Sequence, residues 1–119
     1  MQKKKNNDYK IATSSSLSPE QNEFYRELAA MEFCPFSLII QRLVLYYMDG
    51  RDSPVFGEVA KEALKSVTRR GLQCEVYTSN GFSLKTSEKL RVQAEAKKLG
   101  CSFSAVVQMI IDREITASR

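Results

Sequence analysis

The chain has 119 residues, of which 43% are hydrophobic and 27% are charged, and its formal net charge is +4. This composition indicates a single folded domain rather than a disordered segment. The chain contains no histidine, which excludes imidazole bases, histidine-containing metal sites and the usual histidine-activated nucleophiles. We therefore expect no enzyme activity, no metal site and no cofactor.

Cysteine usage and hydropathy bear on the location of the protein. Cys34, Cys74 and Cys101 lie far apart and form no CxxC pair, which favours reduced cysteines in an intracellular protein. Cys34 and Cys101 are expected to be small buried residues rather than redox sensors. The longest apolar stretch, 38–48, is interrupted by two polar residues and is shorter than the about 20 residues that span a bilayer. We expect a cytoplasmic protein without a membrane segment.

The amino terminus is basic. Residues 1–10 carry four lysines and one aspartate, and polar residues follow the lysines where a signal peptide would continue with an apolar block. We predict a disordered tail over 1–10. Its cations would contact DNA phosphates without sequence preference, the alternative being a solubilising tail; they are Lys3, Lys4, Lys5 and Lys10.

The first half of the chain, 11–50, predicts a strand followed by two helices. The strand covers 11–18, and Ser18 is placed to cap a helix with Pro19 at its first position. A second helix begins at Pro35 and ends at Gly50. Apolar residues recur at helical spacing along the second helix, which therefore has a buried face; they are Phe36, Ile39, Ile40, Leu43, Val44 and Tyr47.

Residues 51–77 form a linker that predicts a helix of its own over about 54–70. The Ser-Pro pair at 53–54 is a helix-start signal, and Arg69, Arg70 and Gly71 suit a helix end. Arg69 and Arg70 are interpreted as cations that complement the helix dipole, with a phosphate contact as the alternative. Residues 72–78 are expected to be extended.

The second half, 78–119, repeats the order of the first. Residues 82–85 alternate apolar and polar, which predicts a strand with one solvated face. Thr86 or Ser87 is expected to cap a helix that runs to Leu99 and stops at Gly100. Ser102 is expected to cap the last helix, whose apolar residues again recur at helical spacing.

The two halves are similar in sequence at an offset of 67 residues. Residues 16–48 align with 83–115, with seven identities in 33 positions, and the match is densest between 34–41 and 101–108. Gln41 and Gln108 occupy equivalent positions, where a structural role is expected. The aromatic residues near these helices are expected in the core or an interface; they are Phe36, Phe103, Tyr46 and Tyr47. We predict two copies of one structural unit.

A single short strand cannot satisfy its backbone hydrogen bonds alone. The strand of the first copy is therefore expected to pair antiparallel with that of the second, and four helices would close around one core. The predicted fold is mainly helical with a two-stranded antiparallel ribbon, a pseudo-twofold between the halves and a linker helix. One chain would then act as a monomer that is its own dimer.

This order of elements, together with the Gly-Cys-Ser-Phe-Ser turn at 100–104, resembles the ribbon-helix-helix DNA-binding family. The resemblance is best over 81–115 and weaker over 14–48. A tandem form in one chain with a basic tail is similar to the VirC-type accessory proteins of tumour-inducing plasmids, which assist T-DNA processing and transfer. The resemblance implies double-stranded DNA as the partner, with other DNA-processing proteins as further partners.

The resemblance also implies a set of base-facing side chains on the ribbon. Five of the six positions are Ser or Gly, and only Lys85 could hold a guanine strongly, so we expect a broad sequence preference and a target that need not be palindromic. The alternative for 14–16 is a flexible polar stretch. The positions are Ser14, Ser16 and Ser18 in the first copy and Gly81, Ser83 and Lys85 in the second.

In this family the N-terminus of the second helix holds a DNA phosphate. By position this falls on Ser102, Phe103 and Ser104 in the second copy and on Phe36 and Ser37 in the first. The residue before them, Pro35, has no backbone N–H, so the first copy is expected to hold its phosphate less tightly.

One alternative class of function uses the same fold. Ribbon-helix-helix units also form the dimerising part of antitoxins and transcriptional repressors, so the chain could be a protein–protein adaptor. An exposed apolar face of the linker helix would then bind the partner.

Overall fold

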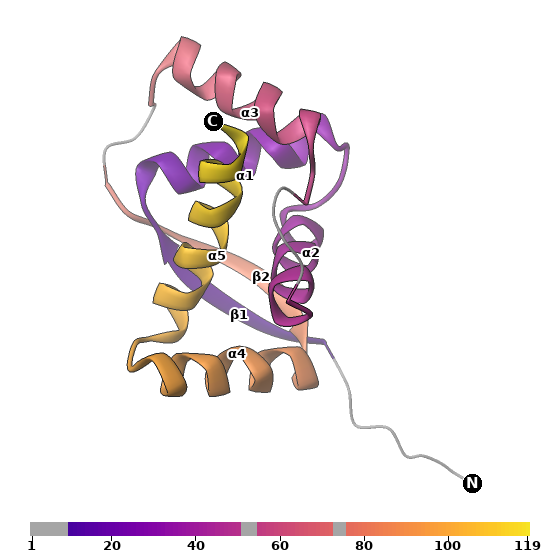
Figure 1. Cartoon of the computed structure of the whole chain (residues 1–119), viewed down its shortest axis with the longest axis vertical. Helices are drawn as coiled ribbons and strands as arrows, with labels where there is room; N and C mark the ends of the chain where they lie inside the picture. Colours follow the sequence, from indigo (N-terminus) through magenta and orange to yellow (C-terminus); the bar gives the residue numbers. More distant parts are fainter. Residues whose placement is uncertain (1–9, 51–54, 73–75) are drawn as a thin grey trace, which may run out of the picture.

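The computed structural model describes residues 10–50, 55–72 and 76–119 (Figure 1). The described part is mainly helical, with one two-stranded antiparallel sheet, which confirms the predicted fold class at this level. Among these residues, none of the helices combines the length and apolar character that crossing a bilayer requires. In chain order the elements are β1 (Lys10–Leu17), α1 (Pro19–Met31), α2 (Phe36–Met48), α3 (Glu58–Arg70), β2 (Thr78–Lys85), α4 (Thr86–Leu99) and α5 (Phe103–Ser118).

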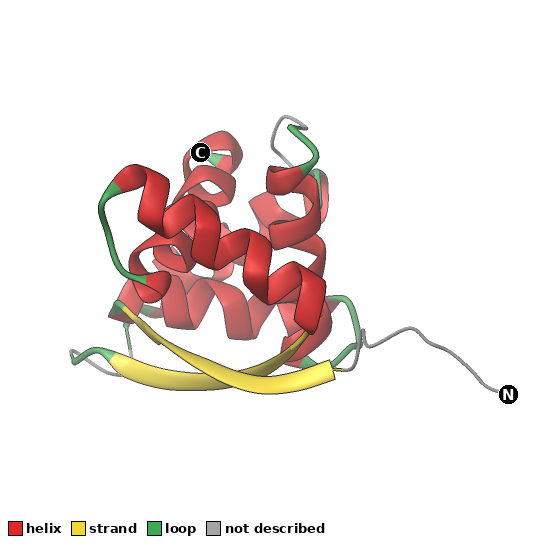
Figure 2. Cartoon of the chain, turned by 90° about the horizontal axis from the view of Figure 1, so that it is seen from below, coloured by secondary structure: helices red, strands yellow, loops and turns green. Residues whose placement is uncertain are grey.

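The two strands come from opposite halves of the chain and pair along their full length. Lys10 lies opposite Lys85, and Ser14 lies opposite Gly81. The predicted antiparallel pairing is therefore confirmed, and β1 starts at Lys10, one residue earlier than expected. Lys10 thus belongs to the ribbon rather than to the tail. Figure 2 shows that the ribbon forms one layer of the molecule and the helices form the other.

Alternation along the strands separates a core face from a solvent face. Leu17, Phe82 and Leu84 are buried on the helix side of the ribbon, as is Ser15. Burial of each such apolar side chain contributes about 1.5–3 kcal/mol to the stability of the fold, relative to leaving it exposed. Because successive strand residues point to opposite faces, burial of these residues leaves the other set facing solvent.

The second helix of each half forms the centre of the core. α2 packs on β2, and α5 packs on β1, so each helix contacts the strand of the other half. The predicted inner faces are confirmed at their centres, where the apolar residues of both helices are buried; these are Ile39, Ile40, Leu43 and Val44 in α2 and Val106, Val107, Ile110, Ile111 and Ile115 in α5. Of the other predicted residues of α2, Tyr47 is partly buried, and the side chain of Phe36 lies outside the described part.

Helix ends follow the predicted signals in most places. The Oγ of Ser18 accepts a hydrogen bond from the N–H of Gln21 at 3.2 Å, and Pro19 is the first residue of α1. Ser102 caps α5 in the same way. The predicted cap of α4 was wrong: the cap is Lys85, whose N–H donates to Glu88 Oε1 at 2.8 Å. The Glu88 carboxylate binds the backbone N–H of the N-cap, in place of the serine or threonine hydroxyl that we expected to cap the helix at residue 86 or 87.

The start of the first copy's second helix is shifted by one residue. Pro35 is the N-cap of α2 rather than its first helical residue. Met48 is the last residue of that helix and Asp49 its C-cap, with Gly50 following at a positive φ of 73°. Gly50 thus lies just beyond the end, where a left-handed residue closes a helix.

The linker helix is shorter at its start than predicted. α3 begins at Glu58 with Gly57 as its N-cap, and residues 53 and 54 lie outside the described part. The reason lies in Glu114, a fully buried residue of α5, whose two carboxylate oxygens accept hydrogen bonds from the N–H groups of Val55 at 2.8 Å and Phe56 at 2.9 Å. These contacts hold the residues before Gly57 as a loop against α5. α3 then packs on α1 and α5.

Candidate nucleic-acid interface

The outer face of the ribbon carries five of the six side-chain positions predicted to face DNA bases. Ser14, Gly81 and Lys85 are exposed, and Ser16 and Ser83 are partly exposed. They come from both halves of the chain and lie side by side because β1 and β2 are paired. The surface is narrow, polar and solvated, and Lys85 is the charged residue among these five positions.

Ser18 does not belong to this surface. β1 ends at Leu17, and Ser18 is the N-cap of α1. Its hydroxyl accepts from the N–H of Gln21, and its own N–H donates to Gln21 Oε1 at 2.8 Å. The prediction extended the strand by one residue, because an N-cap has the same extended backbone as a strand.

The N-terminus of α5 is attached directly to the ribbon. The Oγ of Ser104 accepts a hydrogen bond from the N–H of Ser16 at 3.3 Å, and Gln108 Nε2 donates to the carbonyl oxygen of Ser16 at 2.7 Å. Two side chains of α5 thus hold both polar groups of one ribbon residue. This fixes the first turn of the helix beside the solvated face of the sheet.

The first turn of α5 offers backbone donors at this position. The Oγ of Ser102 accepts from the N–H of Ala105 at 3.1 Å. The N–H groups of Phe103 and Ser104 precede the first intrahelical bonds, so helix geometry gives them no acceptor within the helix. Together with the positive end of the helix dipole they can bind an anion.

The equivalent turn of α2 is chemically different. Its N-cap, Pro35, makes no side-chain cap hydrogen bond, and proline contributes no N–H. The backbone of Phe36 and Ser37 begins the helix, while their side chains lie outside the described part. Lys3, Lys4 and Lys5 of the predicted tail also lie outside the described residues.

Gln41 and Gln108, which occupy equivalent positions in the sequence repeat, have structural roles, as predicted. Gln108 contacts Ser16 through its side chain, and its backbone carbonyl oxygen accepts a hydrogen bond from Gln21 Nε2 at 3.4 Å. Gln41 Nε2 donates to Glu88 Oε1 at 3.3 Å. Each glutamine therefore ties the second helix of one half to the first helix of the other half. The sequence marked these positions only by the recurrence of Ser and Gln four residues apart.

Charge is distributed unevenly between α1 and α4, the first helices of the two halves. α1 has three acidic residues and a fourth, Glu32, at its C-cap. Arginines from other elements pair with them: Arg70 with Glu23 and Glu27, Arg119 with Glu20 at 3.1 Å, and Arg42 with Glu32 at 3.8 Å. The hydrogen bonds that the Arg70 guanidinium donates to the Glu23 and Glu27 carboxylates raise the pKa of Arg70. α4 presents exposed cations; these are Arg91, which pairs with Asp49 at 3.7 Å, and Lys97 and Lys98, with Lys85 just before the helix.

Arg70 therefore has a structural role, because it pairs with Glu23 and Glu27 of α1. It joins the end of α3 to α1, a contact that adds to the role predicted for it at a helix end. Because its guanidinium already binds two carboxylates, it is not available for a phosphate. Arg69, beside it, is exposed.

The cysteines differ from expectation. Cys101 is exposed and Cys34 is partly buried, so the prediction of buried cysteines was wrong for Cys101. Burial raises the pKa of the Cys34 thiol. Cys74 lies outside the described residues. Within the described ranges, no group of three or more cysteine and carboxylate side chains is placed to bind a metal ion.

Comparison with known proteins found no match for this chain among family models, curated proteins or solved structures.

Proposed function

We propose that this chain is a tandem ribbon-helix-helix unit that binds double-stranded DNA by inserting its ribbon into the major groove. The observation that carries the proposal is the surface ribbon itself, two paired strands that lie on one side of the helices (Figure 2). Its solvated face presents Ser14, Ser16, Ser83 and Lys85. The major groove of B-DNA is about 12 Å wide and admits a two-stranded ribbon, whose outward side chains can reach base edges.

Three local equivalences support the tandem arrangement. The ribbon pairs Ser14 with Gly81, two residues that correspond in the sequence repeat. The N-terminal caps of α1 and α4 use the same bond, from the N–H of Ser18 to Gln21 and from the N–H of Lys85 to Glu88, at 2.8 Å in each. These pairs also correspond in the repeat, so equivalent residues make equivalent contacts.

The C-terminal turns of the same helices supply the third equivalence. Phe33 and Gly100 both have positive φ, 53° and 72°. The N–H of the following Cys34 donates to the Ala29 carbonyl at 3.1 Å, and that of Cys101 to the Ala96 carbonyl at 3.0 Å. This is the turn by which a left-handed residue ends a helix, and it occurs at corresponding positions in both halves.

Base contacts in this proposal are few and unequal. Lys85 can donate to the O6 and N7 acceptors of guanine, whereas serine hydroxyls bond to almost any base. We therefore expect a weak or broad sequence preference, with most of the affinity coming from phosphates. Because Lys85 belongs to one half only, the preferred site need not be palindromic.

Phosphate contacts follow the helix N-termini. The first turn of α5, held to the ribbon by Ser104 and Gln108, would bind one phosphate through the N–H groups of Phe103 and Ser104. The turn at Pro35 would bind its phosphate less tightly, and the lysines of the tail would add salt-sensitive affinity. The half that contains α4 is the more basic, which adds to this asymmetry.

At the level of process, we propose an accessory role in plasmid or T-DNA processing and transfer, together with other DNA-processing proteins. This rests on the similarity of a tandem unit with a basic tail to the VirC-type accessory proteins. A broad sequence preference fits an accessory protein that acts beside a sequence-specific enzyme.

The test is a fluorescence-anisotropy titration of the full chain with a labelled duplex at two salt concentrations. We expect affinity that falls steeply with salt, and a loss in Lys85→Ala of about fivefold or more, since a good base contact contributes about 1–3 kcal/mol. Lys65→Ala, which removes the same charge from the exposed side of α3, is the matched control. Equal affinity of both variants and the wild type, with a co-purifying protein, would favour the adaptor function.

A further inference from the structure

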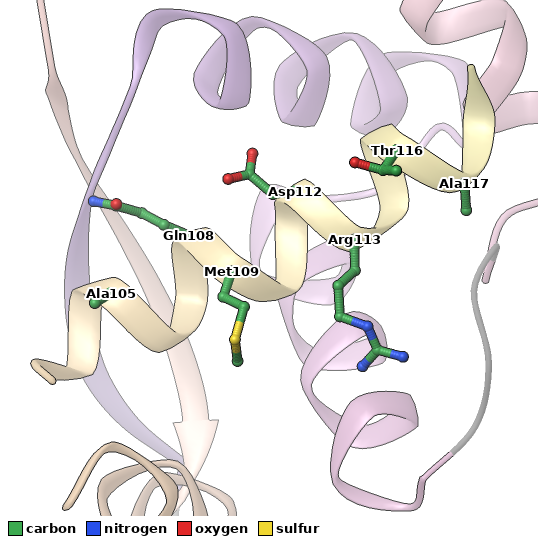
Figure 3. Close-up of a pocket in the computed structure, with 7 residues that line it drawn as sticks. All are labelled: Ala105, Gln108, Met109, Asp112, Arg113, Thr116 and Ala117. Carbon is green, nitrogen blue, oxygen red and sulfur yellow. The ribbon is translucent and has the colours of Figure 1, made fainter. Parts of the chain in front are cut away.

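A shallow hollow of about 570 Å³ follows the solvent side of α5 (Figure 3). All of its described lining residues belong to that one helix: Ala105, Gln108, Met109, Asp112, Arg113, Thr116 and Ala117. A small-molecule site buries most of its ligand's surface between several walls. A hollow with one helical wall suits an elongated surface instead, such as a second helix.

Helical geometry divides these residues into two rows, because residues four apart lie on the same line of a helix. One row contains Met109 and Arg113, and the other contains Asp112 and Thr116. Figure 3 shows that the side chains of Asp112 and Arg113 point to opposite sides of the helix face. The acid and the base are neighbours in sequence but do not face one another.

Neither charge is neutralised by an ion pair in the described part of the chain. Asp112 is exposed, and the guanidinium of Arg113 lies over the ring of Tyr47, 4.9 Å from its centroid. That contact holds the arginine along one edge of the hollow, where its N–H groups have no carboxylate partner among the described residues. The hollow therefore presents one acidic edge and one basic edge.

We propose that a second copy of this chain packs on the hollow, α5 against α5, so that Asp112 of each copy meets the partner's Arg113. A twofold axis parallel to the helices exchanges the two rows and forms two ion pairs. A twofold axis across the helices would instead place acid on acid and base on base. Charge thus selects the parallel arrangement, and the small side chains of Ala105 and Ala117 allow close approach at both ends.

This contact is small and joins two complete folded units. One helix face offers less than the about 1,200–2,000 Å² of a standard stable interface, so the association is weak and depends on protein concentration. Copies held near one another on a single DNA molecule would meet at a higher effective concentration. The self-association itself is independent of the proposed DNA binding.

Sedimentation velocity of the full chain without DNA, over a concentration series, tests the proposal. The weight-average sedimentation coefficient of the wild type should rise with concentration toward that of a dimer. Asp112→Arg alone and Arg113→Asp alone should stay monomeric, because each places like charges at both contacts. An equimolar mixture of the two variants should associate again, because the mixed pair restores an acid opposite a base at both contacts.

The matched controls are Glu62→Arg and Lys65→Asp, which make the same charge changes on the exposed side of α3 and should associate like the wild type. Circular dichroism confirms that each variant is folded. A wild type that stays monomeric at all concentrations would overturn the proposal, as would a mixture that fails to associate. Because no DNA is present, either result leaves the proposed DNA binding to its own test.

Discussion

Ser14 lies directly opposite Gly81 in the ribbon, and these two residues correspond to one another in the sequence repeat. In an antiparallel pair of two repeated strands, only one position can face its own equivalent, and a twofold relation between the strands would be centred there. The offset of 67 residues found by aligning the sequence with itself therefore agrees with the register of the sheet. The two residues differ, however, and so do most of the equivalent pairs around them.

Phe33 corresponds to Gly100 in the sequence repeat, and it gives a first prediction. It takes the left-handed conformation that Gly100 takes in the other half, at a cost of about 1–2 kcal/mol for a residue with a Cβ. Its side chain is 95% exposed, so its removal loses little burial. Glycine raises the entropy of the unfolded chain, which destabilises the fold by about 0.5–1 kcal/mol. Because the relief of the left-handed strain is larger, Phe33→Gly should stabilise the fold by up to about 1 kcal/mol.

Chemical denaturation in urea measures this change, and Gly100→Ala is the reciprocal control. The control should destabilise, because it introduces a Cβ at a left-handed residue. A Phe33→Gly variant less stable than the wild type would contradict the prediction, because it would mean that the exposed Phe33 side chain stabilises the turn at 33–34.

Ser15 gives a second prediction. It is 1% exposed, and its Oγ has no hydrogen-bond partner among the described residues. A buried hydroxyl without a partner costs about 1–3 kcal/mol, so Ser15→Ala should raise the free energy of unfolding by about 1 kcal/mol. Ser14→Ala, on the exposed face of the same strand, should leave it within about 0.5 kcal/mol. Destabilisation by Ser15→Ala, measured by the same denaturation, would contradict this account of the core.

Gly81 gives a third prediction, on DNA affinity. A Cβ at this residue would meet only the carbonyl oxygen of Thr13, at 3.9 Å, and Gly81 is not among the positive-φ glycines. Gly81→Lys should therefore fold and add a cation at the centre of the solvated face. We expect tighter binding at low salt and a slope of log affinity against log salt that is steeper by about one.

A lysine at the exposed Thr68 of α3 is the control for this gain, because it adds the same charge to a different face. Titrations at several salt concentrations with one duplex compare the two variants. Equal gains from Gly81→Lys and Thr68→Lys would mean that net charge, and not the ribbon, determines binding.

Much of the fold could be predicted because local signals and burial agree. The apolar faces of α2 and α5, the Ser18 and Ser102 caps and the antiparallel pairing all follow from spacing and backbone chemistry. The start of α3 could not be predicted, because it depends on Glu114, which lies 58 residues or more away in the sequence and binds Val55 and Phe56. Long-range contacts of this kind leave no local pattern.

The candidate interface was predictable in the same measure. The family resemblance placed Ser14, Ser16 and Ser83 on one face, and the period-two alternation of 82–85 agrees with it for Ser83. The attachment of α5 to Ser16 through Ser104 and Gln108 was not foreseen, because it crosses between halves. Ser18 and the exposed Cys101 were misplaced, since extended caps resemble strands and a cysteine at a turn gives no burial signal.

Chemical-shift mapping by NMR tests the central claim most directly. The ¹⁵N-labelled chain is titrated with a duplex at low salt, and the amide shifts of each residue are followed. DNA binding through the ribbon predicts the largest changes at Ser14, Ser16, Gly81 and Ser83 and in the first turn of α5, with α3 unchanged. Changes centred on α3, or none at any duplex concentration, would contradict it.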